Sequence, residues 1–412
     1  MSGFRLRCCE CDREYSENPA LLVCEACATL QTPGGPTRGV LEVRLDVLPA
    51  EWPKARPSHT DFLKAFLPFS DPSAVAPLDV GGTPLLPAPR LREALDLPRL
   101  WIKDDTRNPS GSTKDRASLL VVAKAKEYGF DTVATASTGN AAAALAAVGA
   151  ASGVRAVVFV PASAPEAKLV QLLCYGADVV RVQGSYDDAF DLCLAACDAF
   201  GWYNRNTALN PFTIEGKKTA ALEVAFAMSS EPPDVVFVPT GDGAILAGAA
   251  KGFGDLVRGG LLARMPRLVA VQPEGSAGIV TAYRDGAESV TPVPDAASVA
   301  DSLTVATPRN AILCLKRIRE SEGGAVAVSD DEILEAIPFL ARHTGVFAEP
   351  AGAAALAGLH RALEDGLVGR GERIVLLITG TGLKDVPAAS RPVERPEPVP
   401  PDLEAVAKRF GL

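Results

Sequence analysis

The segment "DTVATASTGNAAAALAAVGAASGVRAVVFV", Asp131 to Val160, decides the fold class of this chain. It opens with a short apolar run, passes through a turn of Ser, Thr and Gly, and becomes an Ala-rich stretch before a second apolar run. We expect strands at 131–136 and 155–160, with a helix at 140–153 between them. Short apolar strands separated by a helix are typical of a parallel sheet covered on both faces.

The same alternation continues outward in both directions. Around the opening segment we expect helices at 117–129, 165–176 and 185–201 and a strand at 178–183. A second series follows, with strands at 234–240, 267–273 and 373–379 and helices at 215–229, 245–257, 309–321, 330–344 and 352–364. The sequence therefore predicts an α/β protein with two doubly wound open-sheet domains, preceded by a small cysteine-rich ribbon.

The chain has 412 residues, too many for one compact core, so we expect several parts. Residues 1–45 would form an N-terminal zinc-ribbon-like segment. Residues 46–112 and 201–395 would form the larger, cofactor-binding domain, with a smaller α/β domain, 113–200, inserted in it. Residues 396–412 would be a tail helix that follows a Pro-rich linker.

Composition and charge narrow the class of function. A hydrophobic fraction of 48% and a charged fraction of 22% are typical of a soluble globular protein. The net charge of −9 argues against nucleic acid or an anionic membrane as partner. The start of the chain lacks the apolar run of a signal peptide, so the nine cysteines indicate a reducing compartment and we expect a cytoplasmic location.

Four of the cysteines have the spacing of a metal site. They form two Cys-x-x-Cys pairs: Cys8, Cys11, Cys24 and Cys27. Paired motifs of this kind predict a zinc ribbon, and four thiolates leave no open position, so the metal would be structural. A ribbon that has lost its metal remains an alternative, since Asp12 and Ala28 stand where such motifs commonly carry glycine.

Polar, glycine-rich segments follow several of the expected strands. They are "NPSGSTKDRAS" at 108–118, "STGN" at 137–140, "TGDGA" at 240–244 and "TGTGLKD" at 379–385. Each segment alone could be an ordinary turn. Ligands of doubly wound proteins collect where parallel strands end, and Lys114 lies where a helix dipole does not favour a cation. Together the four segments predict a cofactor site.

The chemistry that fits this set is that of pyridoxal phosphate. The three histidines, His59, His343 and His360, all lie outside the polar segments, so a histidine base is hard to build. Lys114 would form the Schiff base with the cofactor aldehyde and act as the catalytic proton shuttle. Its position near a helix start and among polar donors gives reason for a lowered pKa.

The other polar segments supply the remaining contacts. The backbone N–H groups of Gly241, Asp242, Gly243 and Ala244 would hold the cofactor phosphate at a helix N-terminus. Thr379 would contact the pyridine nitrogen and Asn140 the phenolic oxygen, with Asn140 also near the substrate. Ser137 and Thr138 would bind the substrate carboxylate.

The order of these motifs resembles that of threonine synthases, which are pyridoxal phosphate enzymes of the tryptophan synthase β-like fold type. The resemblance also includes "NPFTIEGKKTAALEV", "VFAEPAGAAALAGL", "GGTPLL" and the cysteine ribbon, and it covers roughly residues 5 to 390. It implies conversion of O-phospho-L-homoserine and water to L-threonine and phosphate, with a small amino-acid substrate and a homodimer. The lysine would remove the α- and β-protons, phosphate would leave from Cγ and water would add at Cβ.

Some positions depart from the family pattern. Thr113 stands where a phenylalanine is common, and Thr213 stands where an arginine often holds the substrate phosphate. Asp242 replaces a common asparagine, and we expect its carboxylate to point away from the phosphate. Lys218 and Arg309 are candidates to supply the positive charge that Thr213 lacks, and Lys217 and Arg116 are further candidates.

Other functions remain open at this point. Another pyridoxal phosphate lyase or β-replacement enzyme of the same fold type would share most motifs; examples are a serine/threonine dehydratase or a cysteate synthase-like enzyme. A non-catalytic regulatory protein could keep the fold, although Lys114 is intact. A dinucleotide-binding protein is disfavoured because no Gly-x-Gly-x-x-Gly follows an early strand.

Overall fold

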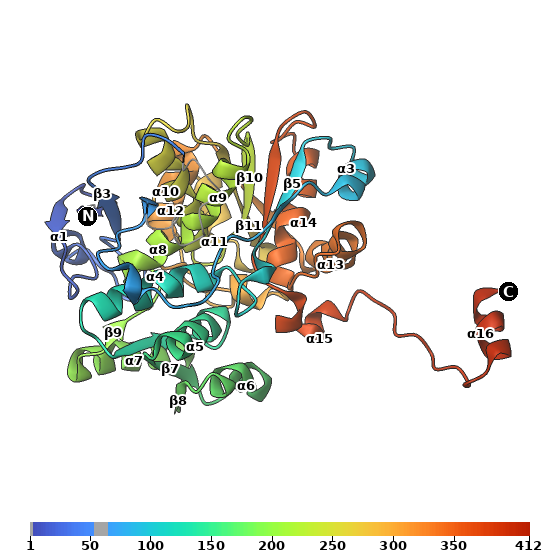
Figure 1. Ribbon diagram of the computed structural model, residues 1–412, viewed down its shortest axis with the longest axis horizontal. Coiled ribbons are helices and arrows are strands. Elements are labelled where there is room, and N and C mark those ends of the chain that lie inside the picture. The colour runs from blue at the N-terminus through green and yellow to red at the C-terminus, as the bar shows by residue number, and fades with distance from the viewer. Residues whose placement is uncertain (1–2, 53–64) are drawn as a thin grey trace.

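The computed structural model describes residues 3–52 and 65–412, and this part of the chain is organised around three sheets (Figure 1). His59 and residues 53–64 of the expected larger domain lie outside the described residues. The two main sheets are open and covered by helices on both faces, so the expected α/β fold class with two doubly wound domains is confirmed.

The N-terminal sheet is small and antiparallel. Its strands are β1 (Phe4–Cys8), β2 (Glu14–Ser16) and β3 (Leu41–Leu45), in the order β2-β1-β3, and the short helix α1 (Glu25–Ala28) follows β2. The Phe4 ring meets the Phe212 ring edge-on at 5.8 Å. The ribbon therefore packs directly on the body of the protein, at one end of the molecule in Figure 1.

The larger sheet has the strand order β12-β11-β10-β13-β5-β4. Its strands are β4 (Leu85–Leu86), β5 (Leu100–Asp104), β10 (Val235–Pro239), β11 (Arg267–Pro273), β12 (Gly324–Val328) and β13 (Ile374–Ile378). All neighbours are parallel except the edge pair β4 and β5. Strand β12 was not expected, because its sequence "GAVAV" is short and rich in small residues.

Two layers of helices bury this sheet. One face packs against α3 (Pro89–Leu95), α13 (Asp330–Thr344) and α14 (Pro350–Glu364). The other packs against α9 (Thr219–Ala227), α10 (Ala244–Arg258), α11 (Gly278–Arg284) and α12 (Ala311–Glu320). The central strands β10 and β13 are buried along their whole length, which explains their continuous apolar sequences.

The smaller sheet is parallel, in the order β8-β7-β6-β9. Its strands are β6 (Thr132–Ala136), β7 (Arg155–Pro161), β8 (Asp178–Val182) and β9 (Tyr203–Asn204). The helices α4 (Lys114–Glu127), α5 (Asn140–Ser152) and α6 (Glu166–Cys174) cover one face, and α7 (Tyr186–Phe200) covers the other. Because β9 pairs with β6, the inserted domain extends beyond the expected boundary at residue 200.

A short helix, α8 (Pro211–Lys217), joins the two domains. The expected helix 215–229 is therefore two helices, α8 and α9, which meet at Lys218. Gly216 allows α8 to approach α4 closely, because a Cβ at this position would collide with the carbonyl oxygen of Arg116. Helix α8 thus lies against the start of α4 on one side and against α10 on the other.

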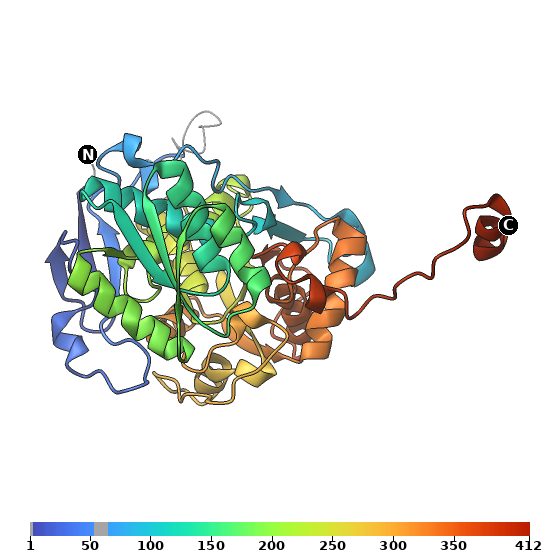
Figure 2. The same cartoon turned by 90° about the horizontal axis from the view of Figure 1, so that it is seen from below.

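The C-terminal segment leaves the body of the protein. After α15 (Val386–Ala389) the chain runs extended to α16 (Leu403–Phe410), which has no buried residue and stands apart in both views (Figures 1 and 2). In the part of the chain that the structure describes, no helix combines the length and apolar character needed to cross a membrane.

Candidate active site

Two of the four polar segments are joined directly by backbone hydrogen bonds. The N–H of Thr113 donates to the carbonyl of Thr379 at 2.8 Å, and Ser112 forms a bridge with Gly380. Gly111 has φ +86°, and a Cβ there would come within 2.8 Å of the Thr381 methyl group. The loop before Lys114 is therefore fixed against the end of β13.

Lys114 is the first residue of α4 and is half-buried. Within the described residues its Nζ has no hydrogen-bond or ion-pair partner. Burial lowers the pKa of Lys114; the charges of Asp242 and Glu349 oppose this effect and that of Arg205 adds to it. A lowered pKa raises the fraction of neutral amine, which is the form that acts as a nucleophile and accepts protons.

The "TGDGA" segment connects β10 to the N-terminus of α10. Gly243 has φ +94°, and a Cβ there would come within 2.6 Å of the Cβ of Cys314. Behind the loop, Asn310 is fully buried, and neither polar atom of its amide has a partner among the described residues. The N–H groups at a helix start, a cradle that admits only glycine and an unpartnered amide suit a phosphate group.

Asp242 does not lie as expected. Its Oδ1 accepts a hydrogen bond from the N–H of Ala244 at 3.0 Å, so the carboxylate faces the helix start instead of pointing away from it. A helix N-terminus attracts negative charge, so this carboxylate and a phosphate would compete for the same N–H group. A phosphate would have to displace this side chain.

Asn140 lies at the interface between the two domains. It is the first residue of α5, and its Nδ2 donates to Glu349 Oε1 at 2.8 Å and to Ser302 Oγ at 3.4 Å. Glu349 precedes α14, and burial raises its pKa to about 7. Glu349 was not expected from the sequence, although an acidic residue within the apolar stretch "VFAEPAGAA" was a usable signal.

A cavity of about 270 Å³ opens beside this hydrogen bond. It is lined from the smaller domain by Thr138, Gly139, Asn140 and Gln171, and from the larger domain by Glu349 and Lys384. Thr138 lines the cavity and Ser137 precedes it in the chain; both are half-buried, and Ser137 Oγ accepts from the N–H of Gly139 at 3.2 Å. The expected substrate loop therefore borders a cavity between the domains.

Thr379 is buried at the end of β13. Gly352, in the first turn of α14, lies against it, and a Cβ there would come within 3.3 Å of the Thr379 nitrogen. This side chain thus lies at the same end of the larger sheet as the glycine loop.

The structure corrects the candidates for the missing positive charge. The Nζ of Lys218 is enclosed by Glu215 and by Asp255, the latter at 2.8 Å. Asp255 lies eleven residues beyond the start of α10, about 16 Å along its axis, so Lys218 does not reach the site. Arg309 pairs with exposed Asp187 at 3.2 Å and stacks on a phenylalanine ring, so it lies at the surface between the domains.

Arg116 is likewise engaged elsewhere. Its guanidinium donates to Asp105 at 2.7 Å and to Glu223 at 2.6 Å. Among the residues that the structure describes, the two buried cations near Lys114 that remain without a carboxylate partner are Lys217 and Arg205. Arg205 was missed from the sequence, where it appears only as a charged residue within "WYNRN".

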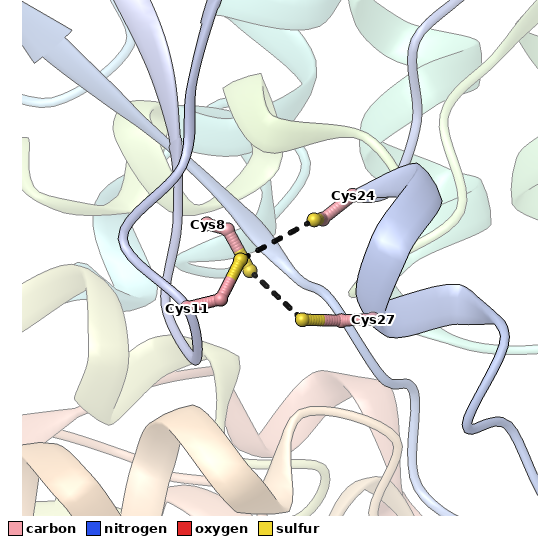
Figure 3. Close-up of side chains that lie close together, drawn as sticks. All are labelled: Cys8, Cys11, Cys24 and Cys27. Carbon is pink, nitrogen blue, oxygen red and sulfur yellow. Dashed lines mark hydrogen bonds between the residues drawn. The ribbon is translucent and has the colours of Figure 1, made fainter.

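The four ribbon cysteines lie together, as Figure 3 shows. The Sγ atoms of Cys8 and Cys27 are 3.7 Å apart, as are those of Cys11 and Cys24, and all four lie within 4.8 Å of one another. Four sulfurs placed 2.3 Å from a tetrahedral zinc ion would be about 3.8 Å apart. The donor set and its spacing therefore fit zinc.

The comparison with protein families agrees with the chemistry of the site. The protein-family model described as "Pyridoxal-phosphate dependent enzyme" matches residues 76–380, which include Lys114, the glycine loop and Thr379. The chain therefore belongs to the family of pyridoxal-phosphate dependent enzymes.

Relatives of nearly full length define the branch of this family. The chain is 35% identical to threonine synthase of Methanocaldococcus jannaschii over 98% of both chains, and 36% identical to threonine synthase of Methanosarcina acetivorans over 99% of both. Within the family it belongs with the threonine synthases. Among solved structures, the processed form of threonine deaminase isoform 2 from Solanum lycopersicum matches with a TM-score of 0.65. That match has 24% identity over 82% of this chain and 89% of the other, and it shows the shared fold.

Proposed function

We propose that this protein is a threonine synthase, which converts O-phospho-L-homoserine and water to L-threonine and phosphate with pyridoxal phosphate as cofactor. One observation carries the proposal: the lysine of lowered pKa lies beside the glycine loop in a chain that aligns end to end with threonine synthases. The cysteine ribbon lies within that alignment, which favours this activity over that of a dehydratase.

Residues on both domains would hold the cofactor. Lys114 would bind it covalently, the N–H groups of residues 241–244 would hold its phosphate, and Asn140 and Thr379 would contact its ring. Bound in this way, pyridoxal phosphate supplies an electron sink for negative charge that develops on the substrate carbons. Asp242 would release the N–H of Ala244 when the phosphate enters, because both anions compete for the same donor.

The substrate would occupy the cavity between the domains. The start of α5 carries no side-chain cap, so the N–H groups of Asn140 and Ala141, with Ser137 and Thr138, are available to the substrate carboxylate. The neutral amine of Lys114 would take the proton from the α-carbon, pass it on before taking the proton from the β-carbon, and later return protons to the γ- and α-carbons. Burial suits this role, because the amine loses its proton more readily there than in water.

Incubation of the cofactor-loaded protein with O-phospho-L-homoserine tests the function. We expect L-threonine and phosphate in equal amounts, and little reaction with L-threonine, L-serine or O-phospho-L-serine. Formation of 2-oxobutanoate or pyruvate with ammonia as the main reaction would contradict the proposal and indicate a dehydratase.

We also propose that Cys8, Cys11, Cys24 and Cys27 hold a structural zinc ion. The ribbon packs against the larger domain: Lys316 of α12 donates to the carbonyl of Cys9 at 2.7 Å. Elemental analysis should find one zinc per chain, lost in Cys24→Ser and retained in Cys9→Ser. Metal-free wild-type protein of unchanged stability would contradict this assignment.

A cytoplasmic homodimer completes the proposal. The cysteines form no disulfides in the described structure, which favours a reducing compartment. Proteins of this fold type are commonly dimers, which favours a homodimer. Sedimentation of the purified protein should give twice the mass of the chain, and a monomer of full activity would contradict it.

A further inference from the structure

Lys217 and Arg205 are the buried cations that the cofactor assignment leaves unexplained. Their side chains are nearly inaccessible, with exposed fractions of 2% and 1%. The other deeply buried cations, Lys103, Lys124, Lys218, Lys251 and Arg116, each pair with at least one carboxylate. Within the described residues Lys217 and Arg205 have no such pair. A buried charge without a counter-ion is unfavourable, so a protein that keeps two of them near its catalytic lysine indicates an anionic ligand.

Lys217 lies where two helix N-termini meet. Its Cβ packs against α10 at Gly248, where an added Cβ would come within 2.7 Å of it. Gly248 is one turn beyond the start of α10. The preceding residue, Gly216, packs on the backbone of Arg116 and Ala117, in the first turn of α4 after Lys114. The backbone of Lys217 therefore lies between the start of α4, which carries the catalytic lysine, and the start of α10, which follows the glycine loop.

Arg205 reaches the same region from the smaller domain. Its backbone N–H donates to the carbonyl of Ala134 at 2.8 Å, which fixes it just beyond β9. Its Nε donates to Ser118 Oγ at 3.3 Å and its Nη1 to Thr207 Oγ1 at 3.4 Å. Ser118 is one helical turn beyond Lys114 on the same face of α4. The third nitrogen, Nη2, is buried and has no acceptor in the described part of the chain.

The charges around these two side chains agree with the geometry. Burial lowers the pKa of Lys217 well below its ordinary value; Asp242 opposes this effect, and Lys114 and Arg205 add to it. Burial lowers the pKa of Arg205 to about 10, again with Asp242 in opposition. Asp242 is itself engaged with the N–H of Ala244. Three basic groups therefore share one carboxylate in this region, and their lowered pKa values reflect burial without a second anion to oppose it.

We propose that Lys217 and Arg205 form the subsite for the phosphate group of the substrate, beside the loop that holds the phosphate of the cofactor. The inference rests on the proposed function and names the residues that receive its phosphomonoester dianion. The position of Thr213 does not serve this purpose, because that side chain is fully buried and its hydroxyl donates to the carbonyl of Asn210 at 2.8 Å.

The subsite also has a role in the chemical step. When Lys114 takes the β-proton, the Cγ–O bond breaks and its electron pair leaves with the phosphate oxygen. Two cations in a buried region offset the charge that gathers on the departing phosphate, and such electrostatic stabilisation is strong where water is excluded. Lys217 and Arg205 should therefore affect phosphate departure as well as binding.

The test compares Lys217→Gln and Arg205→Leu with Lys126→Gln, a control that removes an exposed cation from α4. In cofactor-loaded enzyme we expect kcat/KM for O-phospho-L-homoserine to fall about 100-fold or more in each of the first two variants. We expect no change beyond about threefold in the control. Inhibition by inorganic phosphate should weaken in parallel, while the dissociation constant of the cofactor stays within about threefold of wild type.

A second substrate separates the subsite from the rest of the reaction. 2-Aminobut-3-enoate has the carbon skeleton that remains after phosphate leaves, and its hydration to threonine does not require phosphate departure. The two variants should convert it at nearly the wild-type rate. If wild type makes no threonine from O-phospho-L-homoserine, the proposed function fails.

If wild type makes threonine and both variants keep kcat/KM within about threefold, the subsite fails while the function stands. Loss of cofactor affinity with unchanged phosphate inhibition would also overturn the subsite, by assigning the two cations to the cofactor phosphate. If Arg205→Leu does not fold, Lys217→Gln decides the question, with Lys217→Arg expected to restore phosphate inhibition. Calorimetric titration with inorganic phosphate gives a reading independent of turnover: proton uptake on binding in wild type, and less uptake in Lys217→Gln.

Discussion

Lys217 and Lys218 are neighbours in the chain, and both are almost completely buried, yet they lie in opposite surroundings. Lys218 faces the middle of α10, where Glu215 and Asp255 enclose its ammonium group. Lys217 faces the first turns of α10 and α4, where no carboxylate pairs with it in the described structure. Burial alone therefore does not identify a functional charge in this molecule, whereas the lack of a partner does.

The two regions have different charge balances. Around Lys218 two lysines face two carboxylates, since Lys251 also contacts Asp255, at 2.5 Å, and Glu215, at 3.4 Å. Such a closed network fixes α8 against α10. Around Lys217 three cations, Lys114, Lys217 and Arg205, share the influence of Asp242. We call these three residues the open group. Its lysines can change protonation and the group can accept an anion, and the proposed reaction needs both a proton acceptor and a phosphate site.

The largest expected effect comes from the catalytic member of the open group. Lys114→Ala should lower kcat/KM for O-phospho-L-homoserine by about 10⁴-fold or more, because both covalent attachment and proton transfer are lost. Its stability should change little, since a desolvated charge disappears with the side chain. Steady-state kinetics and urea unfolding measure the two quantities. A variant that keeps a tenth of the activity would contradict the role of Lys114.

Lys218→Met breaks the closed network and should act on stability. It leaves Glu215 and Asp255 with Lys251 alone, so we expect a loss of about 3–5 kcal/mol in the free energy of unfolding. The kcat of the folded fraction should remain near the wild-type value. A stable variant with a strongly raised KM for the phosphorylated substrate would show that the comparison assigns the two lysines the wrong way round.

The sequence predicts the local elements of the site, but it does not predict which of its lysines faces the site. The strand–turn–helix unit at residues 131–153 and the helix at Lys114 follow from apolar periodicity and turn chemistry, which are local. The spacing of the cysteines likewise predicts their cluster. Which of Lys217 and Lys218 faces the site depends on how α8 is rotated between α4 and α10, and that rotation is a tertiary property.

Glu349 and Arg205 were missed for a related reason. Each is a single charged residue beside an apolar run, and its importance appears only when the other domain packs against it. The domain boundary was misplaced because β9 has two residues, too few to show a period, and is identified by its pairing with β6.

Glu349→Gln tests the effect of a buried acid on the pH dependence of stability. Burial raises the pKa of Glu349 to about 7 in the folded protein, so the protonated carboxyl favours the folded state. This contribution is fully present below the pKa of the unfolded chain, about 4.3, and is lost as the pH rises through 7. Relative to wild type, the variant should gain about 2–3 kcal/mol of stability between about pH 5 and about pH 8. Denaturant unfolding at both pH values measures it, and parallel curves would contradict the raised pKa.

Lys217→Met should have the smallest effect on stability. Removal of a desolvated charge without a partner should change the free energy of unfolding by less than about 1 kcal/mol, or increase it. Urea unfolding beside Lys218→Met gives the direct contrast between neighbouring positions. A loss equal to that of Lys218→Met would mean that Lys217 has a structural partner after all.

The path of oxygen distinguishes threonine synthesis from hydrolysis of the phosphate ester. The cofactor-loaded enzyme is allowed to turn over O-phospho-L-homoserine in water enriched in oxygen-18, and both products are examined by mass spectrometry. We expect the label in the hydroxyl group of L-threonine and none in the phosphate, because the Cγ–O bond breaks and water adds at Cβ. Label in the phosphate, with homoserine in place of threonine, would contradict it, because the protein would then be hydrolysing the phosphate ester.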